Sequence, residues 1–96
     1  MKLTPLNEID EDRKFFKGTV LRFYYHDEDY YDYLLASAPW EKDMMAVNIT
    51  EDSIKRGYVY AGVIPVTPKN NEFAVVKKGF QHAFGKNLDG WFLLEK

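Results

Sequence analysis

Short runs of β-branched and aromatic residues, each closed by a turn signal, recur along this chain of 96 residues. The runs lie at 19–25, 31–36, 44–49, 58–64 and 91–94, and a shorter one is favoured at 73–76. Such spacing is typical of an antiparallel sheet that curls on itself, and the absence of a long strand–helix alternation excludes a parallel α/β sheet. The sequence therefore predicts an α+β fold: a strongly bent antiparallel sheet, or a small partly open barrel, of five to six strands with one short helix.

The segment 73–85 carries two competing patterns. Val76, Phe80 and Phe84 recur at spacing four, which is typical of a helix. Gly79 lies in the middle of this segment and weakens a helix by about 1 kcal/mol relative to alanine. We favour a strand at 73–76 and a helix or turn at 78–85 ended by Gly85, and leave strand against helix open.

The length supports one domain, residues 1–96, with one hydrophobic core. Apolar residues make up 46% of the chain and aromatic residues 17%, which allows efficient burial. The polar segment 1–14 is expected to form a loosely ordered extended arm, or one short helical turn after Pro5. In the first strand either Val20 and Phe23 or Leu21 and Tyr25 point inward. The predicted core comprises Val20, Phe23, Leu35, Val47, Ile49, Val63 and Phe92.

Composition argues against several classes of function. The chain has no cysteine, so a disulfide framework or a thiolate metal site is excluded. No apolar stretch has the length of a signal-peptide core or a membrane span, which predicts a cytoplasmic protein without membrane contact. The net charge is −2, and no cluster of lysine and arginine offers the phosphate contacts that direct nucleic-acid binding needs.

No constellation for catalysis is recognisable. His26 and His82 are the two groups that titrate near neutrality without help, and neither has a nucleophile or carboxylate at motif spacing. His26 adjoins acids, but adjacent residues on a turn point in different directions. Nucleophile elbows, phosphate loops and paired metal-ligand motifs are absent. We therefore expect no enzyme activity, no catalytic residues, no metal site and no cofactor.

The most distinctive segment combines acids with tyrosines between residues 24 and 32. Tyrosine supplies a large contact area with a polar tip and is enriched in protein interfaces, while acids steer a basic partner. The alternative is that alternate tyrosines belong to the core and the acids keep a sheet edge soluble. The candidate partner-binding residues are Tyr25, Asp27, Glu28, Asp29, Tyr30, Tyr31 and Asp32.

Five segments follow one another in an order that resembles a known family. They are Gly-Thr-Val-Leu-Arg-Phe at 18–23, Tyr-Asp-Tyr-Leu-Leu at 31–35, Val-Asn-Ile-Thr at 47–50, Tyr-Ala-Gly-Val-Ile at 60–64 and Trp91-Phe92. The order is similar to that of small immunity proteins from bacterial polymorphic-toxin systems, over about residues 15–94. The resemblance implies a cytosolic antidote that binds and blocks a cognate toxin domain, and it implies no catalytic residues.

Three functional hypotheses follow from these observations. The first is an immunity protein that occludes the active site of a toxin, with the acidic tyrosine-rich segment filling a basic cleft. The second is a small ribonuclease toxin on an SH3-like barrel, for which Arg22, Lys42 and Arg56 are the available cations. The third is a regulatory or structural interaction module without catalytic activity. The oligomeric state is left open.

Overall fold

The computed structural model of the chain describes residues 2–37, 44–50, 60–64 and 74–95. Its strands form one antiparallel sheet in the order β1-β6-β2-β3-β4-β5. They are β1 (Lys2–Pro5), β2 (Val20–His26), β3 (Asp29–Ser37), β4 (Met44–Asn48), β5 (Tyr60–Ile64) and β6 (Trp91–Glu95). A 3-10 turn, η1 (Leu6–Glu8), and one helix, α2 (Lys77–Phe84), complete the described elements. The α+β class with an open antiparallel sheet is thus confirmed.

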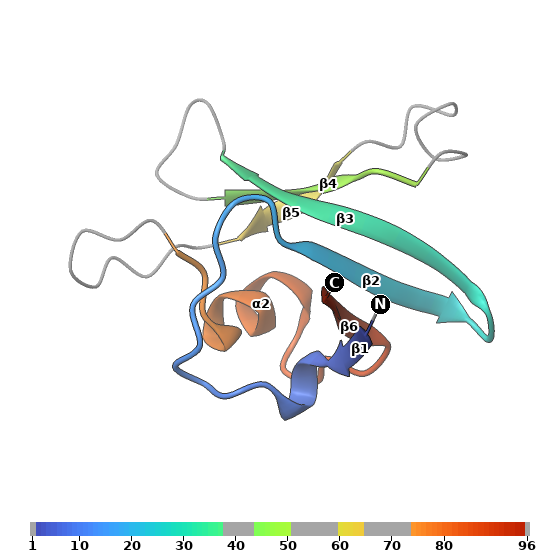
Figure 1. Cartoon of the computed structure of the whole chain (residues 1–96), viewed down its shortest axis with the longest axis horizontal. Helices are drawn as coiled ribbons and strands as arrows, with labels where there is room; N and C mark the ends of the chain where they lie inside the picture. Colours follow the sequence, from blue (N-terminus) through green and yellow to red (C-terminus); the bar gives the residue numbers. More distant parts are fainter. Residues whose placement is uncertain (1, 38–43, 51–59, 65–73, 96) are drawn as a thin grey trace.

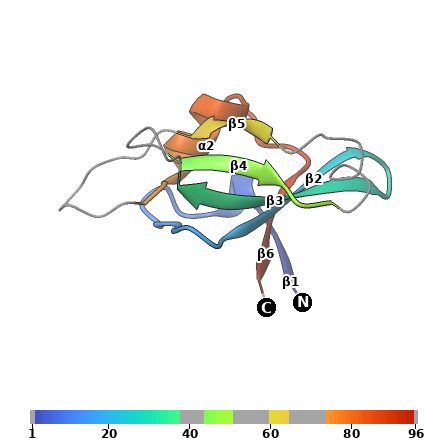
Figure 2. The same cartoon turned by 90° about the horizontal axis from the view of Figure 1, so that it is seen from above.

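The sheet is strongly bent, as strands with a right-handed twist allow. In Figure 1, β3, β4 and β5 cross above α2, while β6 and β1 lie below the upper strands. The view from above in Figure 2 shows β6 and β1 running at a steep angle to β3 and β4. Helix α2 lies on the concave side of this bend, where it contacts β5, and η1 contacts β6.

The hydrophobic core fills the space between the concave face and α2. Alternate residues of β3, β4 and β6 point to this face, as the period of two requires. Leu21, Leu35 and Ala46 contribute from three neighbouring strands, and Phe80 contributes from the helix; each is at most 1% exposed. Phe23 and Tyr33 are partly buried and pack against the same cluster.

The predicted core was right about the strands but partly wrong about which residues face inward. Leu35 is buried, whereas Val20, Val47 and Phe92 lie only partly buried on the convex face, and Ile49 is 38% exposed. Val63 lies outside the residues whose side chains are described. The error has a simple cause: β2, β4 and β6 carry apolar residues on both faces, so alternation alone does not identify the inner one.

The N-terminal segment is part of the sheet, not the loosely ordered arm expected from its polarity. Strand β1 pairs with β6 in antiparallel register from Lys2 opposite Glu95 to Pro5 opposite Phe92. The turn after Pro5 forms as expected, and Leu6 within it is fully buried. Ile9, three residues after Leu6, also belongs to the core.

The ambiguity over residues 73–85 resolves in favour of the helix. Helix α2 places Phe80 in the core, and the Gly85 N–H donates to the Gln81 carbonyl at 2.9 Å, which ends the helix. Among the described residues, the expected strand at 73–76 is reduced to one bridge, in which Val75 and Phe15 exchange two hydrogen bonds of 2.8 Å.

Gly90 has a backbone that other residues rarely adopt, with φ of 84°, and it lies against β2. A Cβ at this position would approach the Tyr24 carbonyl oxygen to 3.1 Å. Gly90→Ala should therefore lower the free energy of unfolding by about 2 kcal/mol, measured by urea denaturation. Gly18→Ala is the control, because Gly18 also has positive φ but no atom within 4 Å of an added Cβ. Equal losses in the two variants would show that the contact with β2 is unimportant.

Candidate interaction surface

The acidic tyrosine-rich segment forms the hairpin of β2 and β3, whose tip projects beyond the rest of the described fold (Figure 1). His26 pairs with Asp29 in the ladder, so only Asp27 and Glu28 make the turn. Two-residue connections are common in hairpins because they fit the twist of the strands. The apolar runs at 19–25 and 31–36 leave residues 26–30 between them, so the observed turn is shorter than that gap, and Asp27 has positive φ.

The hairpin distributes the seven candidate residues over three regions. Asp27, Glu28 and Asp29 lie at the tip and are exposed. Tyr25 and Tyr31 lie on the concave side of the hairpin, which continues the face of the core. Tyr30 and Asp32 lie on the opposite, convex side. No single flat surface can therefore present all seven residues to a partner.

On the concave side, aromatic rings form a continuous row from the core to the tip. The Tyr25 ring stacks on Tyr31 with 4.5 Å between centroids, and Tyr31 contacts Tyr33 at 6.4 Å. Tyr33 in turn contacts Trp91 at 5.5 Å, and Trp91 stacks on Phe84 of α2 at 3.9 Å. Burial raises the pKa of the Tyr33 hydroxyl. Tyr25, at the outer end, is 51% exposed. The row therefore presents an exposed ring on a buried support.

On the convex side, Asp32 belongs to an internal ion pair with Arg22. Arg22 Nε and Nη2 donate to the two Asp32 carboxylate oxygens at 2.8 Å and 3.2 Å. The guanidinium carbon also lies 3.7 Å from the centroid of the Tyr30 ring, and Arg22 is only 8% exposed. Hydrogen bonding to Asp32 raises the pKa of Arg22 above its already high value. The Asp32 carboxylate is therefore occupied by an ion pair between β2 and β3.

This ion pair also bears on the ribonuclease alternative. A catalytic cation must reach the substrate phosphate, but the Arg22 guanidinium is held by Asp32 and covered by Tyr30. The other two cations of that hypothesis, Lys42 and Arg56, lie outside the described residues.

The hairpin tip carries exposed charge of one dominant sign. The side chains of His26, Asp27 and Asp29 are 70%, 89% and 65% exposed. His26 Nδ1 lies 3.9 Å from an Asp27 carboxylate oxygen and 3.8 Å from one of Asp29. Within the described part of the chain, no group of three or more histidines and acids is arranged to hold a metal ion. His82 is exposed on α2.

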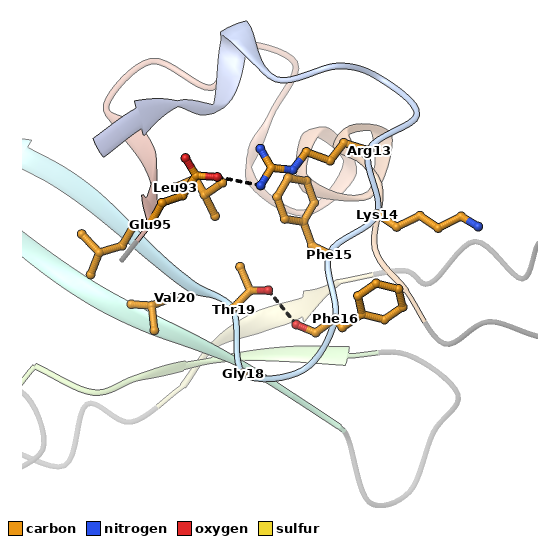
Figure 3. A pocket seen from close by; sticks show the side chains of 10 residues that line it. Arg13, Lys14, Phe15, Phe16, Gly18, Thr19, Val20, Leu93 and Glu95 are labelled. Atoms are coloured by element: carbon orange, nitrogen blue, oxygen red, sulfur yellow. Dashed lines mark hydrogen bonds and ion pairs between the residues drawn. The ribbon is translucent and has the colours of Figure 1, made fainter. Parts of the chain in front are cut away.

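A second feature, not anticipated from the sequence, is an open pocket of about 440 Å³ (Figure 3). It lies between the segment 13–19 and the end of β6. Arg13 donates to Glu95 at 2.6 Å and covers the Phe15 ring at 5.1 Å, and the ion pair lowers the pKa of Glu95. The Thr19 hydroxyl donates to the Phe16 carbonyl at 2.7 Å. These lining groups are thus already engaged with one another.

Sequence reasoning found the hairpin but missed what supports its rings. Tyr33, Trp91 and Phe84 come from three different elements, and only the folded sheet brings them together. Alternation placed Tyr31 and Tyr33 on one face, but continuing it across the two-residue turn would put Tyr25 opposite Tyr30. A register shift between Tyr24 and His26 brings the Tyr25 ring to the Tyr31 side, and alternation alone does not reveal that shift.

Comparison of the chain with family models, curated proteins and solved structures gives no match. Within the described ranges, no helix combines the length and apolar character that crossing a membrane requires.

Proposed function

We propose that the protein is a cytosolic immunity protein that binds a cognate bacterial toxin domain and occludes its active site with the β2–β3 hairpin. The observation that carries this proposal is the pairing of a projecting acidic tip with exposed tyrosine rings on a buried aromatic support. The resemblance to polymorphic-toxin immunity proteins supports the same conclusion. Neither a cofactor nor a catalytic residue of this chain is needed for inhibition by occlusion.

The acidic tip supplies steering toward a basic cleft. Toxins that act on nucleic acids or nucleotides need cations to hold phosphates, and exposed carboxylates on a protrusion complement such a site. Exposed charges contribute mainly to the rate of association, because water and salt screen them once contact is made. Asp27, Glu28 and Asp29 therefore accelerate encounter more than they hold the complex.

The concave tyrosines supply the anchor. Tyr25 is half exposed, and its stacking on Tyr31 limits the freedom that the ring loses when a partner covers it. Preorganised aromatic side chains that enter a partner's pocket are the commonest strong contacts in protein interfaces. Removal of the Tyr25 ring should therefore raise the rate at which the complex dissociates.

The test uses the product of the gene immediately upstream as the toxin, with co-expression measuring rescue and surface plasmon resonance measuring rates. The triple variant Asp27→Asn, Glu28→Gln, Asp29→Asn should slow association about tenfold at low salt, and by much less at high salt. Tyr25→Ala should speed dissociation, with a loss of about 2 kcal/mol if the ring fills a pocket.

A matched control removes the same charge elsewhere. Glu8, Asp10 and Glu11 are exposed near the N-terminus, and the triple variant Glu8→Gln, Asp10→Asn, Glu11→Gln changes net charge equally. Equal slowing by both triple variants would show that only net charge matters and would remove the hairpin from the proposal. Growth arrest when this chain is expressed alone would instead favour the toxin alternative.

A further inference from the structure

The convex face of the sheet carries an unbroken apolar row across five strands. Leu3 of β1 lies opposite Leu94 of β6, and Leu94 lies opposite Val20 of β2. Val20 lies opposite Leu34 of β3, which lies opposite Val47 of β4. All five side chains are partly exposed. A solvated face of an antiparallel sheet ordinarily carries polar residues at these positions.

Two rows nearer the hairpin tip extend the surface. Toward the hairpin tip, Phe92 lies opposite Arg22, and Tyr24 lies opposite Tyr30. The Arg22 charge in this row is already neutralised by Asp32. The described helix lies on the other face of the sheet (Figure 1). The convex face is thus an apolar surface that none of the described helical segments covers.

Charge along β2 is polarised from one end of this face to the other. Asp27 and Glu28 lie beyond the outer end, whereas the exposed Lys17 precedes the inner end. The Gly18 N–H donates to the Leu35 carbonyl at 2.8 Å, which fixes Lys17 at the base of β2 beside β3. Lys17 precedes Arg22 by five residues and Asp27 follows it by five, so the two charges flank Arg22.

We propose that this convex face pairs with the same face of a second copy of the chain, with the strands of the two copies antiparallel. A two-fold axis across β2 near Arg22 brings the acidic tip of each copy to the Lys17 end of the other. The apolar row of one copy then covers Tyr24 and Tyr30 of its partner. In such an isologous contact each acidic tip faces Lys17 of the other copy, so the two charge contacts form together. A parallel arrangement would instead place the two acidic tips side by side.

The area of the convex face determines the dimer affinity to expect. Two convex faces of a bent sheet meet mainly along the strands nearest the axis, β6, β2 and β3. Three strands about 4.8 Å apart and about 20 Å long bury roughly 600 Å² over the two copies. That value is below the usual range of stable specific interfaces, so the dimer is weak and should dissociate on dilution. This pairing does not depend on the proposed function, but it engages the acidic tip, so a second copy and a toxin would compete for Asp27 and Glu28 while the concave rings of Tyr25 and Tyr31 stay accessible.

Sedimentation equilibrium of the full chain from micromolar to millimolar concentration tests the pairing. Wild type should show a monomer–dimer equilibrium, and Leu34→Lys should weaken it by about tenfold or more because a charge would be buried in the apolar row. His82→Lys is the control, because His82 is exposed on α2, on the other face of the sheet. Thermal unfolding of each variant confirms that the monomer is folded.

A charge exchange tests the orientation. Lys17→Glu should weaken the dimer, and the double variant Lys17→Glu, Glu28→Lys should restore it, with both effects shrinking at high salt. A wild type that stays monomeric throughout would overturn the proposal, and so would a dimer indifferent to Leu34→Lys. Failure of the double variant to restore pairing would overturn the antiparallel arrangement. A monomer whose toxin affinity falls in Leu34→Lys would assign the face to the toxin instead.

Discussion

Phe80→Ala is expected to lower the free energy of unfolding by about 3–5 kcal/mol, the largest loss for any single substitution considered for this chain. Phe80 is fully buried and is the residue through which α2 enters the concave face. Its ring lies 5.3 Å from Phe15 and 6.2 Å from Phe84. Truncation removes the apolar contacts and leaves a cavity that the sheet cannot collapse to fill.

Urea denaturation followed by far-UV circular dichroism measures this loss. His82→Ala is the matched control, because His82 is exposed on the same helix and alanine there changes helix propensity without altering the core. The control should remain within about 0.5 kcal/mol of wild type. A Phe80→Ala variant that behaves like His82→Ala would show that the helix does not seal the core. Retained toxin protection by His82→Ala would agree with a non-catalytic role for that histidine.

The pattern of short strands was predictable because each strand ends at a residue with a clear effect on the backbone. Turn residues after His26 and around Gly90 delimit their strands without reference to the rest of the fold. The helix at 77–84 could also be predicted from the spacing of Phe80 and Phe84. Packing of both rings against the core outweighs the cost of Gly79. These are local properties, and local reasoning captures them.

Which face of a strand is buried was not predictable in this way. In β2 both Val20 and Leu21 are apolar, but only Leu21 faces α2, with no exposed surface. The choice depends on the position of the helix, which is set by contacts between residues distant in the sequence. The same reason explains the N-terminal segment, because Leu6 is buried only once β1 has paired with β6.

The hairpin was identified from composition, but its division into two faces was not. Tyr30 and Tyr31 are adjacent in the chain and therefore point to opposite sides of the sheet. Tyr31 joins the row that leads to Trp91, whereas Tyr30 covers Arg22. Composition counts both rings as one surface, and only strand register separates them.

Asp32→Ala is expected to lower the free energy of unfolding by about 3 kcal/mol, because it leaves a largely buried guanidinium without its carboxylate. The side chains of Arg22 and Asp32 are only 10% and 20% exposed, so water replaces the lost partner poorly. The Tyr30 ring at 3.7 Å and a hydrogen bond to the Tyr24 side chain offset a part of this cost, but neither carries the negative charge of the lost carboxylate.

A second variant separates the cost of an orphaned charge from the value of the pair. The double variant Arg22→Met, Asp32→Leu keeps similar bulk and removes both charges, and it should be about 2 kcal/mol more stable than Asp32→Ala. Glu28→Ala is the control for loss of an acid in the same hairpin, because Glu28 is exposed at the turn and should change stability by less than about 0.5 kcal/mol. If the double variant were no more stable than Asp32→Ala, the loss would come from packing around residue 32, and the ion pair would not be what holds β2 against β3. If Asp32→Ala bound the toxin with unchanged rates once folded, Asp32 would support the convex face without contacting the toxin, as its bonds to Arg22 imply.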